Sequence, residues 1–410
     1  MADRPAAAGG LRGALGAMGL GTRILLGMVV GALLGAVLGE GILFIEPLGD
    51  LFVRLLILAA VPLVFFNLLA GLTTLTDLKT LGRLAGKILG FFFATTIVAL
   101  LFGIAAMAIL RPGVGMTLQG VVEEEVGVAP SVIQILMDLV PENLFQAFAE
   151  GDVAQVVVVA VFIGIATLLL PESPRDRLRK AFADLADLFR KFVDLILLVA
   201  PYGIGALMAV TIGRYGSELF GPMARFIAGV TAAHLVMILL YMVLLRLFTT
   251  RRPWDFLRET WSVWATTIST TSSLASLSVG LDVAEQMRLP RSIYAFTLPL
   301  GAQINKDGTA AMLSAVVIFT MQAAGVPTTA GDLFTVVLMG FLLSAGSGGI
   351  PGGGFVVALI MVEAFSLPLE LAVIVGGIYR LIDMGNTTAN IMGDMVGTVI
   401  LADRERVGKD

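Results

Sequence analysis

An apolar run is interrupted from Leu300 to Met312 by the sequence LGAQINKDGTAAM. A charged side chain inside a membrane costs about 2.5 to 3.5 kcal/mol even on the lenient insertion scale, so the polar core NKDGT marks an ion or substrate pathway. A second stretch, DMGNTTANIMGD, repeats polar side chains every three or four positions and gathers them on one stripe of a helix. The stripe consists of Asp383, Asn386, Thr387, Asn390 and Asp394. The alternative is that these groups only join helices by hydrogen bonds.

The composition agrees with a membrane setting. Of 410 residues, 57% are hydrophobic and 14% are charged, and the mean hydropathy is +0.94. Average soluble domains have roughly 25% charged residues, so the chain is a polytopic membrane protein rather than several soluble domains. The formal charge of −4 offers no basic surface for nucleic acid. Zero cysteines and one histidine exclude a disulfide scaffold and most zinc or thiol chemistry.

The apolar runs predict eight transmembrane helices, because each approaches the ~20 residues that cross a bilayer. They lie at about 24–38, 51–72, 88–110, 153–170, 192–213, 226–248, 292–324 and 367–402. Two further apolar stretches, 256–281 and 333–362, are broken. We therefore expect an all-α fold with eight spans and two re-entrant hairpins.

Loop charges predict the topology, because basic residues stay in the cytoplasm. Basic loops at 79–87, 175–191 and 246–258 alternate with acidic loops at 40–50 and 123–152. Arg258 and Arg288 flank the first broken stretch, so both of its ends are cytoplasmic; Asp332 and Glu363 flank the second, so both of its ends lie outside. A plasma (inner) membrane protein results, with a cytoplasmic leader at 1–22 and a cytoplasmic tail at 403–410.

Each hairpin tip has residues suited to irregular backbone. The inner tip reads TTISTTSSLASLS over 266–278, and the outer tip reads SAGSGGIPGGG over 344–354. Irregular backbone at membrane depth survives only when it is buried in protein or lines a cavity, and half-helix ends there form ion and substrate sites. The alternative is loose packing of glycine between spans.

The order of these pieces resembles the glutamate-transporter family of dicarboxylate/amino acid:cation symporters. NKDGT, GIPGGG and DMGNTTANIMGD carry the resemblance, supported by VRLLILAAVPLVF from Val53, and it covers Arg23 to Ala402. It implies a homotrimeric elevator transporter that is not an enzyme and has no cofactor. The implied scaffold is 23–80 (helices 1 and 2) and 111–215 (helices 4 and 5). The implied transport domain is 81–110 (helix 3) and 216–402, which holds helix 6, the inner hairpin, broken helix 7, the outer hairpin and helix 8.

The resemblance also implies site residues. Asp383 corresponds to the carboxylate that holds a substrate ammonium group. The other implied substrate residues are Ser272, Ser273, Thr309, Ile350, Asn386, Thr387 and Asn390. The implied cation residues are Asn305, Asp307, Asp394, Thr95 and Thr96, with backbone carbonyls at Gly301, Gln303, Ser344, Ala345, Ser347 and Asn390. All are oxygen donors, which suits a hard cation such as sodium.

Five positions depart from the family pattern. Lys306 stands where the family has Met, and Asn386 replaces the Arg of members that take acidic amino acids. The other departures are Tyr379 for an acidic residue, Phe92 for an aromatic hydroxyl and Ser278 for Pro. The Lys306 ammonium can replace a bound cation by pairing with Asp307 or Asp394, or it can carry a proton. Its alternative is to extend out of the site.

We expect a symporter of amino acids or small dicarboxylates in which Lys306 weakens or replaces sodium coupling, leaving it sodium-independent or proton-coupled, with Na⁺ or H⁺ as coupling ion. An ordinary sodium-coupled symporter of acidic or neutral amino acids is the first alternative. An ion channel is remote, and an enzyme would need Ser272 or Ser273 activated by Lys306. Arg380 either supplies a displaced positive charge or pairs with Asp383, and His234 is interpreted as a packing residue.

Overall fold

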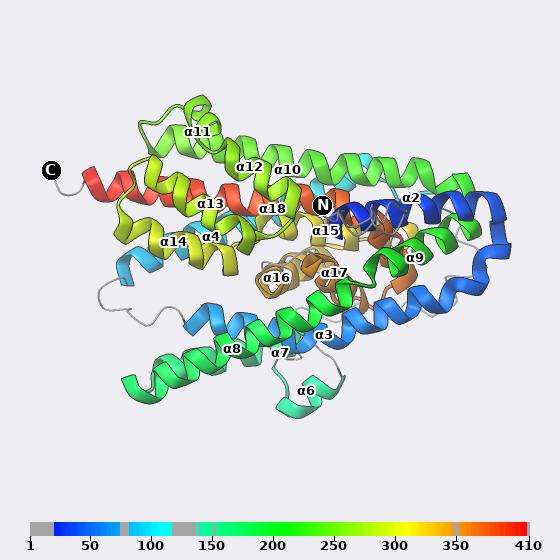
Figure 1. The fold of residues 1–410 in the computed structure, drawn as a ribbon, viewed down its shortest axis with the longest axis horizontal. Helices are drawn as coiled ribbons and strands as arrows, with labels where there is room; N and C mark the ends of the chain where they lie inside the picture. Colours follow the sequence, from blue (N-terminus) through cyan, green and yellow to red (C-terminus); the bar gives the residue numbers. More distant parts are fainter. Residues whose placement is uncertain are drawn as a thin grey trace, which may run out of the picture.

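The computed structural model describes residues 20–73, 82–116, 137, 140–150, 153–347 and 352–407, and these contain helices and no strands. Most of the predicted leader, much of the acidic loop before 140, the outer tip with Ile350, and the last three residues lie outside the described residues. The all-helical class predicted from the sequence is confirmed for the part of the chain that is described (Figure 1).

The helices follow the predicted order. They are α2 (Leu20–Leu38), the 3-10 helix η1 (Gly39–Ile45), α3 (Glu46–Thr73), α4 (Gly82–Leu110), α6 (Leu144–Glu150), α7 (Val153–Leu168), α8 (Glu172–Leu197), α9 (Ala200–Tyr215), the 3-10 helix η2 (Gly216–Leu219), α10 (Phe220–Phe248), α11 (Pro253–Glu259), α12 (Trp261–Thr270), α13 (Ser273–Gln286), α14 (Arg291–Ile304), α15 (Asp307–Ala323), α16 (Ala330–Gly346), α17 (Gly353–Ala364) and α18 (Leu369–Val407).

Three described helical segments are long and apolar enough to cross a membrane: Thr22–Thr73, Leu84–Leu110 and Phe220–Phe248. A fourth results if α8 and α9, which meet at 55°, form one bent span. The shorter apolar helices include α16 and α17, which cover the stretch predicted as the outer hairpin. Eight crossings therefore remain a prediction.

Helix α8 differs from the sequence-based expectation. The basic segment 175–191 was expected to be a cytoplasmic loop, but it forms one helix with the apolar residues that follow. The helix begins directly after Pro171, and its buried residues are Ala186, Val193, Ile196 and Leu197. Mean hydropathy over a window misses such a helix, because charges on one face offset the apolar residues on the other.

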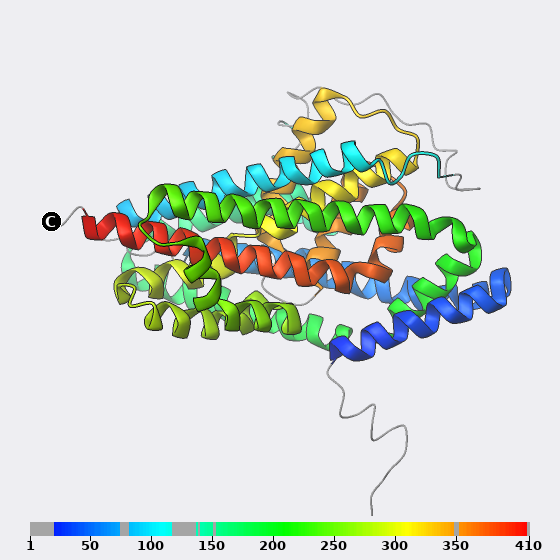
Figure 2. The same cartoon turned by 90° about the horizontal axis from the view of Figure 1, so that it is seen from above.

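The helices form two neighbouring groups. In the first, α3 contacts α7, α8 and α9, and α2 lies along α9. In the second, α4, α10 and α18 surround α15, and α14 lies against α18 (Figures 1 and 2). Every residue of α15 except Gln322 is buried. The second group thus has the deepest core, and it includes both ends of the break in NKDGT.

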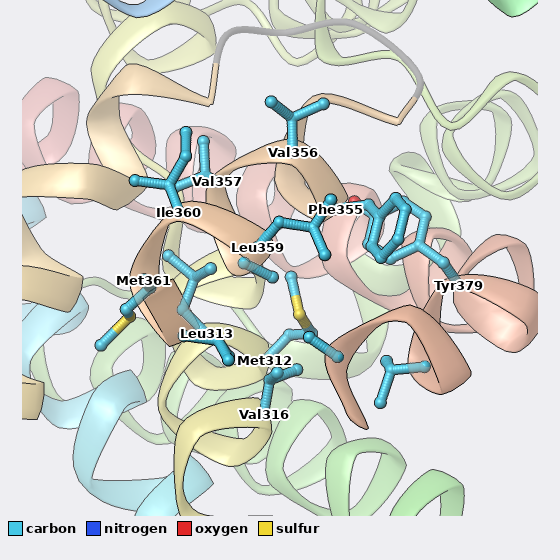
Figure 3. Close-up of a cluster of buried hydrophobic side chains, with 14 of the residues drawn as sticks. Met312, Leu313, Val316, Phe355, Val356, Val357, Leu359, Ile360, Met361 and Tyr379 are labelled. Atoms are coloured by element: carbon cyan, nitrogen blue, oxygen red, sulfur yellow. The ribbon is translucent and has the colours of Figure 1, made fainter. Parts of the chain in front are cut away.

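Apolar packing also fixes the outer hairpin. Met312, Leu313 and Val316 of α15 meet Phe355 and neighbouring side chains of α17, with Tyr379 of α18 at the edge (Figure 3). The rings of Phe355 and Tyr379 lie 5.6 Å apart between centroids. This cluster holds the first turns of α17 beside the polar stripe of α18.

Candidate functional site

The site is built around the break between α14 and α15. Helix α14 ends where the Asn305 amide donates to the Gly301 carbonyl at 2.8 Å, and α15 begins where the Ala310 amide donates to the Lys306 carbonyl at 2.7 Å. Asn305, Lys306 and Asp307 are each 0% exposed. The charged core of NKDGT is thus enclosed by protein, as polar residues at membrane depth require.

Two hydroxyl groups hold the Asp307 carboxylate. Thr96 of α4 donates to Oδ1 at 2.7 Å, and Tyr241 of α10 donates to Oδ2 at 2.5 Å. Thr96 was predicted from the sequence, whereas Tyr241 was missed. A tyrosine within an apolar span is a signal that could have found it, because a buried phenol hydroxyl usually has a partner. Tyr241 brings to Asp307 an aromatic hydroxyl of the kind that Phe92 lacks.

Asn305, Asn390 and Asp394 form a second polar cluster. The Asn305 amide nitrogen donates to Asp394 Oδ1 at 3.0 Å and to the Asn390 carbonyl at 3.4 Å. Asn305 Oδ1 and Asp394 Oδ2 are buried and have no hydrogen-bond partner. A Cβ on Gly301 would overlap the Asp394 carboxylate, so glycine lets these groups approach. Unpaired buried oxygens of this kind fit a hard cation, which takes oxygen ligands.

Lys306 does not make the ion pair expected from the sequence. Its ammonium donates to the Ala302 carbonyl, one turn back in α14, and no salt bridge to it occurs among the described residues. Asp307 is already occupied by two hydroxyls, whereas the last carbonyls of a helix attract a cation. Because the side chain is wholly buried, it does not extend out of the site.

Asn390 ties α18 to the start of α15. Its Oδ1 accepts from the Gly308 amide at 2.8 Å and from the Thr309 amide at 3.3 Å. Its Nδ2 donates to the Thr309 hydroxyl at 3.2 Å. The structure thereby brings two predicted substrate residues together and satisfies two amides of the first turn of α15.

Asp383 lies between α18 and the outer hairpin. Its Oδ1 accepts from the Tyr379 hydroxyl at 2.8 Å, and its Oδ2 accepts from the Gly352 amide at 3.3 Å. Asp383 is 5% exposed, and Thr387 is likewise buried. Tyr379, noted in the sequence only as a departure from the family pattern, is thus a direct partner of the predicted ammonium anchor.

Asn386 has a different environment. It is 0% exposed, and neither its Nδ2 nor its Oδ1 has a hydrogen-bond partner. The nearby His234 ring makes a 3.2 Å hydrogen bond through Nε2 to the Gly308 carbonyl and faces Gly385. Since a carbonyl only accepts, Nε2 carries the proton. His234 is a satisfied buried histidine, and the amide of Asn386 stays available.

Arg380 contacts the inner hairpin and forms no salt bridge with Asp383. Its guanidinium donates to the Thr271 hydroxyl and, at 3.3 Å, to the Ser269 carbonyl. Thr271 ends α12 in the left-handed conformation, with φ of 49°. Ser272 then caps α13 by accepting from the Ala275 amide at 3.2 Å, and Ser273 is buried.

Other predicted cation residues have local or different contacts. At the end of α16, Ser344 donates to the Phe341 carbonyl at 3.1 Å and Ser347 donates to the Ser344 carbonyl at 2.8 Å, with Ala345 between them. Thr95 donates to the Phe92 carbonyl at 3.1 Å. The remaining predicted position, Gln303, accepts through its side chain from Arg190 of α8 at 3.2 Å. The sequence missed Arg190 because it lies in the segment expected to be a loop.

Comparisons with known proteins agree with this site. A family model described as "Sodium:dicarboxylate symporter family" matches residues 20–404. The chain is 28% identical over 391 residues to a proton/glutamate-aspartate symporter of Bacillus subtilis, covering 94% of each. It is 29% identical over 396 residues to a C4-dicarboxylate transport protein of Cupriavidus necator, covering 94% of this chain and 91% of that one. It is 26% identical over 400 residues to a proton/sodium-glutamate symport protein of Bacillus caldotenax, covering 95% of each.

Proposed function

The chain belongs to the sodium:dicarboxylate symporter family, and on that premise we propose that it is a secondary active transporter of an amino acid or a small dicarboxylate. The relatives are named for transport of glutamate, aspartate and C4-dicarboxylates, with protons or sodium in the names of some. Members of this class bind a small solute within the membrane and exchange its access between the two sides.

The observation that supports an amino acid most directly is the position of Asp383. Its carboxylate is buried, carries hydrogen bonds from Tyr379 and Gly352, and lacks an arginine or lysine partner among the described residues. A buried carboxylate without a cation is costly, and a substrate ammonium group would compensate its charge. We therefore assign Asp383 as the ammonium anchor, with Thr309, Thr387 and Asn390 as its neighbours.

We further propose an elevator movement in a homotrimer. The first helix group would be the fixed scaffold, from 23–80 and 111–215. The second would be the moving transport domain, from 81–110 and 216–402. Support comes from the hydrogen bonds of the site, which join α4, α10, α15 and α18 to one another. A group bound together in this way can move as one body against its neighbour.

Lys306 is the basis for our proposal on coupling. Its ammonium is wholly enclosed beside the Ala302 carbonyl, in the region where the family resemblance puts a cation. A tethered ammonium supplies a positive charge without taking an ion from solution, so substrate affinity should depend little on sodium.

A second candidate is an ordinary sodium-coupled symporter. Asn305 Oδ1 and Asp394 Oδ2 favour it, because both oxygens are buried without a partner and could coordinate sodium although Lys306 is present. In that case sodium would be a second cargo of the transporter. The two candidates differ in one measurable property, the dependence of substrate affinity on sodium.

The test begins with a thermal-shift screen of amino acids and dicarboxylates in sodium and in choline buffer. The ligand found is then titrated against the wild type, Lys306→Met and Lys180→Met, which removes an exposed lysine of α8 as the control. We expect the wild type and the control to bind equally in both buffers. Lys306→Met should bind at least about tenfold more weakly without sodium, which is about 1.4 kcal/mol, and should regain some sodium dependence. Steep sodium dependence in the wild type would support the second candidate.

A further inference from the structure

Arg190 joins the two helix groups. It extends from α8 and donates through Nε and Nη2 to Asn67 Oδ1 of α3, at 3.1 and 2.7 Å. Its Nη1 donates to Asp187 at 2.6 Å. Its Nη2 also donates to Gln303 Oε1 of α14, at 3.2 Å. The side chain is 14% exposed, so the fork is largely shielded from solvent.

The contact falls at a sensitive point of α14. Gln303 is in the last turn of that helix, three residues before Lys306. The last carbonyls of a helix carry partial negative charge, so a guanidinium is favoured beside them. The approach is close because Gly71 of α3 faces Gln303 and Ile304: a Cβ on Gly71 would lie 3.5 to 3.6 Å from their side chains.

Arg190 is held more firmly on its own side than across the boundary. Three of its four hydrogen bonds go to Asn67 and Asp187, within the α3 and α8 pair. The fourth, to Gln303, is its longest. The charge of Lys306 also repels it. If the groups separate, the guanidinium therefore stays with α3 and α8, and the bond to Gln303 is the one that breaks.

We propose that Arg190 is a positioning residue for transport: it holds the α14 end of the second helix group against the first, in the orientation of this structure, and releases Gln303 whenever that group moves. The proposal rests on the elevator movement proposed above. It assigns to Arg190 and Gln303 a stabilisation of one orientation, separate from binding of the substrate or the coupling ion. It also explains why a cation stands in a half of α8 that faces other helices.

The experiment uses the absence of cysteine from the chain. Spin labels at Lys180→Cys on α8 and Asp282→Cys on α13 report the distance between the two groups, since both residues are exposed. Distance distributions are recorded by pulsed electron resonance on the full chain in lipid nanodiscs, without ligand. The backgrounds are wild type, Arg190→Leu, Arg190→Lys, Gln303→Leu and Gln303→Glu, with Arg177→Leu as an exposed α8 control.

We expect the wild type to populate the spacing of this structure together with at least one other. Arg190→Leu and Gln303→Leu should each lower the ratio of the first population to the others by about tenfold, and Arg190→Lys by less, because lysine keeps the charge but loses the fork. Gln303→Glu should raise the ratio, because a charge-assisted bond is stronger. Arg177→Leu should match the wild type. Melting temperatures of all variants, measured in parallel, separate a shift of orientation from loss of the fold.

Two results would overturn the proposal, and they differ in what else they remove. If the wild type has two populations and the Arg190 and Gln303 variants leave their ratio unchanged, Arg190 only joins α3 to α8, and the elevator proposal stands. If every variant and the wild type share one fixed spacing under all conditions, the elevator movement fails together with the role of Arg190. If only Arg190→Leu shifts the ratio and Gln303→Leu does not, the contact to α14 is not the one that holds the orientation.

Discussion

At the scale of single residues, each buried carboxylate of the site has its own partners. Asp307 accepts from two hydroxyls, Asp394 from an amide, and Asp383 from a phenol and a backbone amide. None of these partners is charged, so each carboxylate can still attract a cation. The charge of a substrate ammonium or a coupling ion is what this arrangement leaves unmatched.

Asp383 gives the sharpest residue-scale prediction. Asp383→Ala should abolish amino acid uptake in proteoliposomes, because the substrate ammonium would lose its only charged partner in the proposed site. Tyr379→Phe removes one hydrogen bond from the carboxylate but keeps the ring against Phe355, so uptake should continue with a higher KM. Undiminished uptake in Asp383→Ala would end this assignment.

At the scale of elements, glycine lets α14 and α18 approach each other. Gly301 faces the Asp394 carboxylate so closely that an added methyl group would overlap it. The carboxylate cannot move away freely, since Asn305 donates to it at 3.0 Å. The packing of these two helices and the polar cluster between them therefore depend on one missing side chain.

Gly301→Ala should consequently destabilise the protein by about 1 to 3 kcal/mol, the usual cost of overpacking a filled interior. Gly86→Ala in α4 is the matched control, because nothing lies within 4 Å of the position its Cβ would take. The control should be neutral or should gain up to about 1 kcal/mol from helix propensity. Thermal unfolding in detergent measures both variants, and equal melting temperatures would contradict the overlap at Gly301.

At the scale of the whole molecule, the two helix groups and the loop charges must be consistent with one membrane. The basic half of α8 and the turn before α16 are expected on opposite sides, because basic residues stay in the cytoplasm. Thr329 and Asp332 cap α16 at that turn, with the Thr329 amide donating to Asp332 at 2.7 Å. A capped, exposed turn offers a labelling position that does not disturb the fold.

Single cysteines test this arrangement in a chain that has none of its own. In whole cells, a membrane-impermeant maleimide should label Thr328→Cys and should label Lys180→Cys only after the membrane is opened. Both positions are exposed, so reactivity reports the side of the membrane. Labelling of the two positions from the same side would remove the predicted topology and the re-entrant path of the outer hairpin.

Local patterns in the sequence were sufficient for the elements of the site. Polar residues inside apolar runs identified the break at Asn305 and Lys306, and a three-to-four spacing identified the stripe of α18, because both signals lie within a few residues of one another. Hydropathy failed at α8, where an amphipathic helix averages to the value of a loop. The eight crossings, the domain division and the role of each site residue remain predictions.

The tertiary structure alone decided which side chains meet. Tyr241 reaches Asp307 across 66 positions, and Arg190 reaches Gln303 across 113, distances in the chain over which no periodic pattern exists. The direction of Lys306 was likewise undetermined by its motif, because the sequence shows two neighbouring carboxylates but not the hydroxyls that already occupy one of them. A buried charge takes the partner that the packing of other helices leaves available, and for Lys306 that partner is the Ala302 carbonyl.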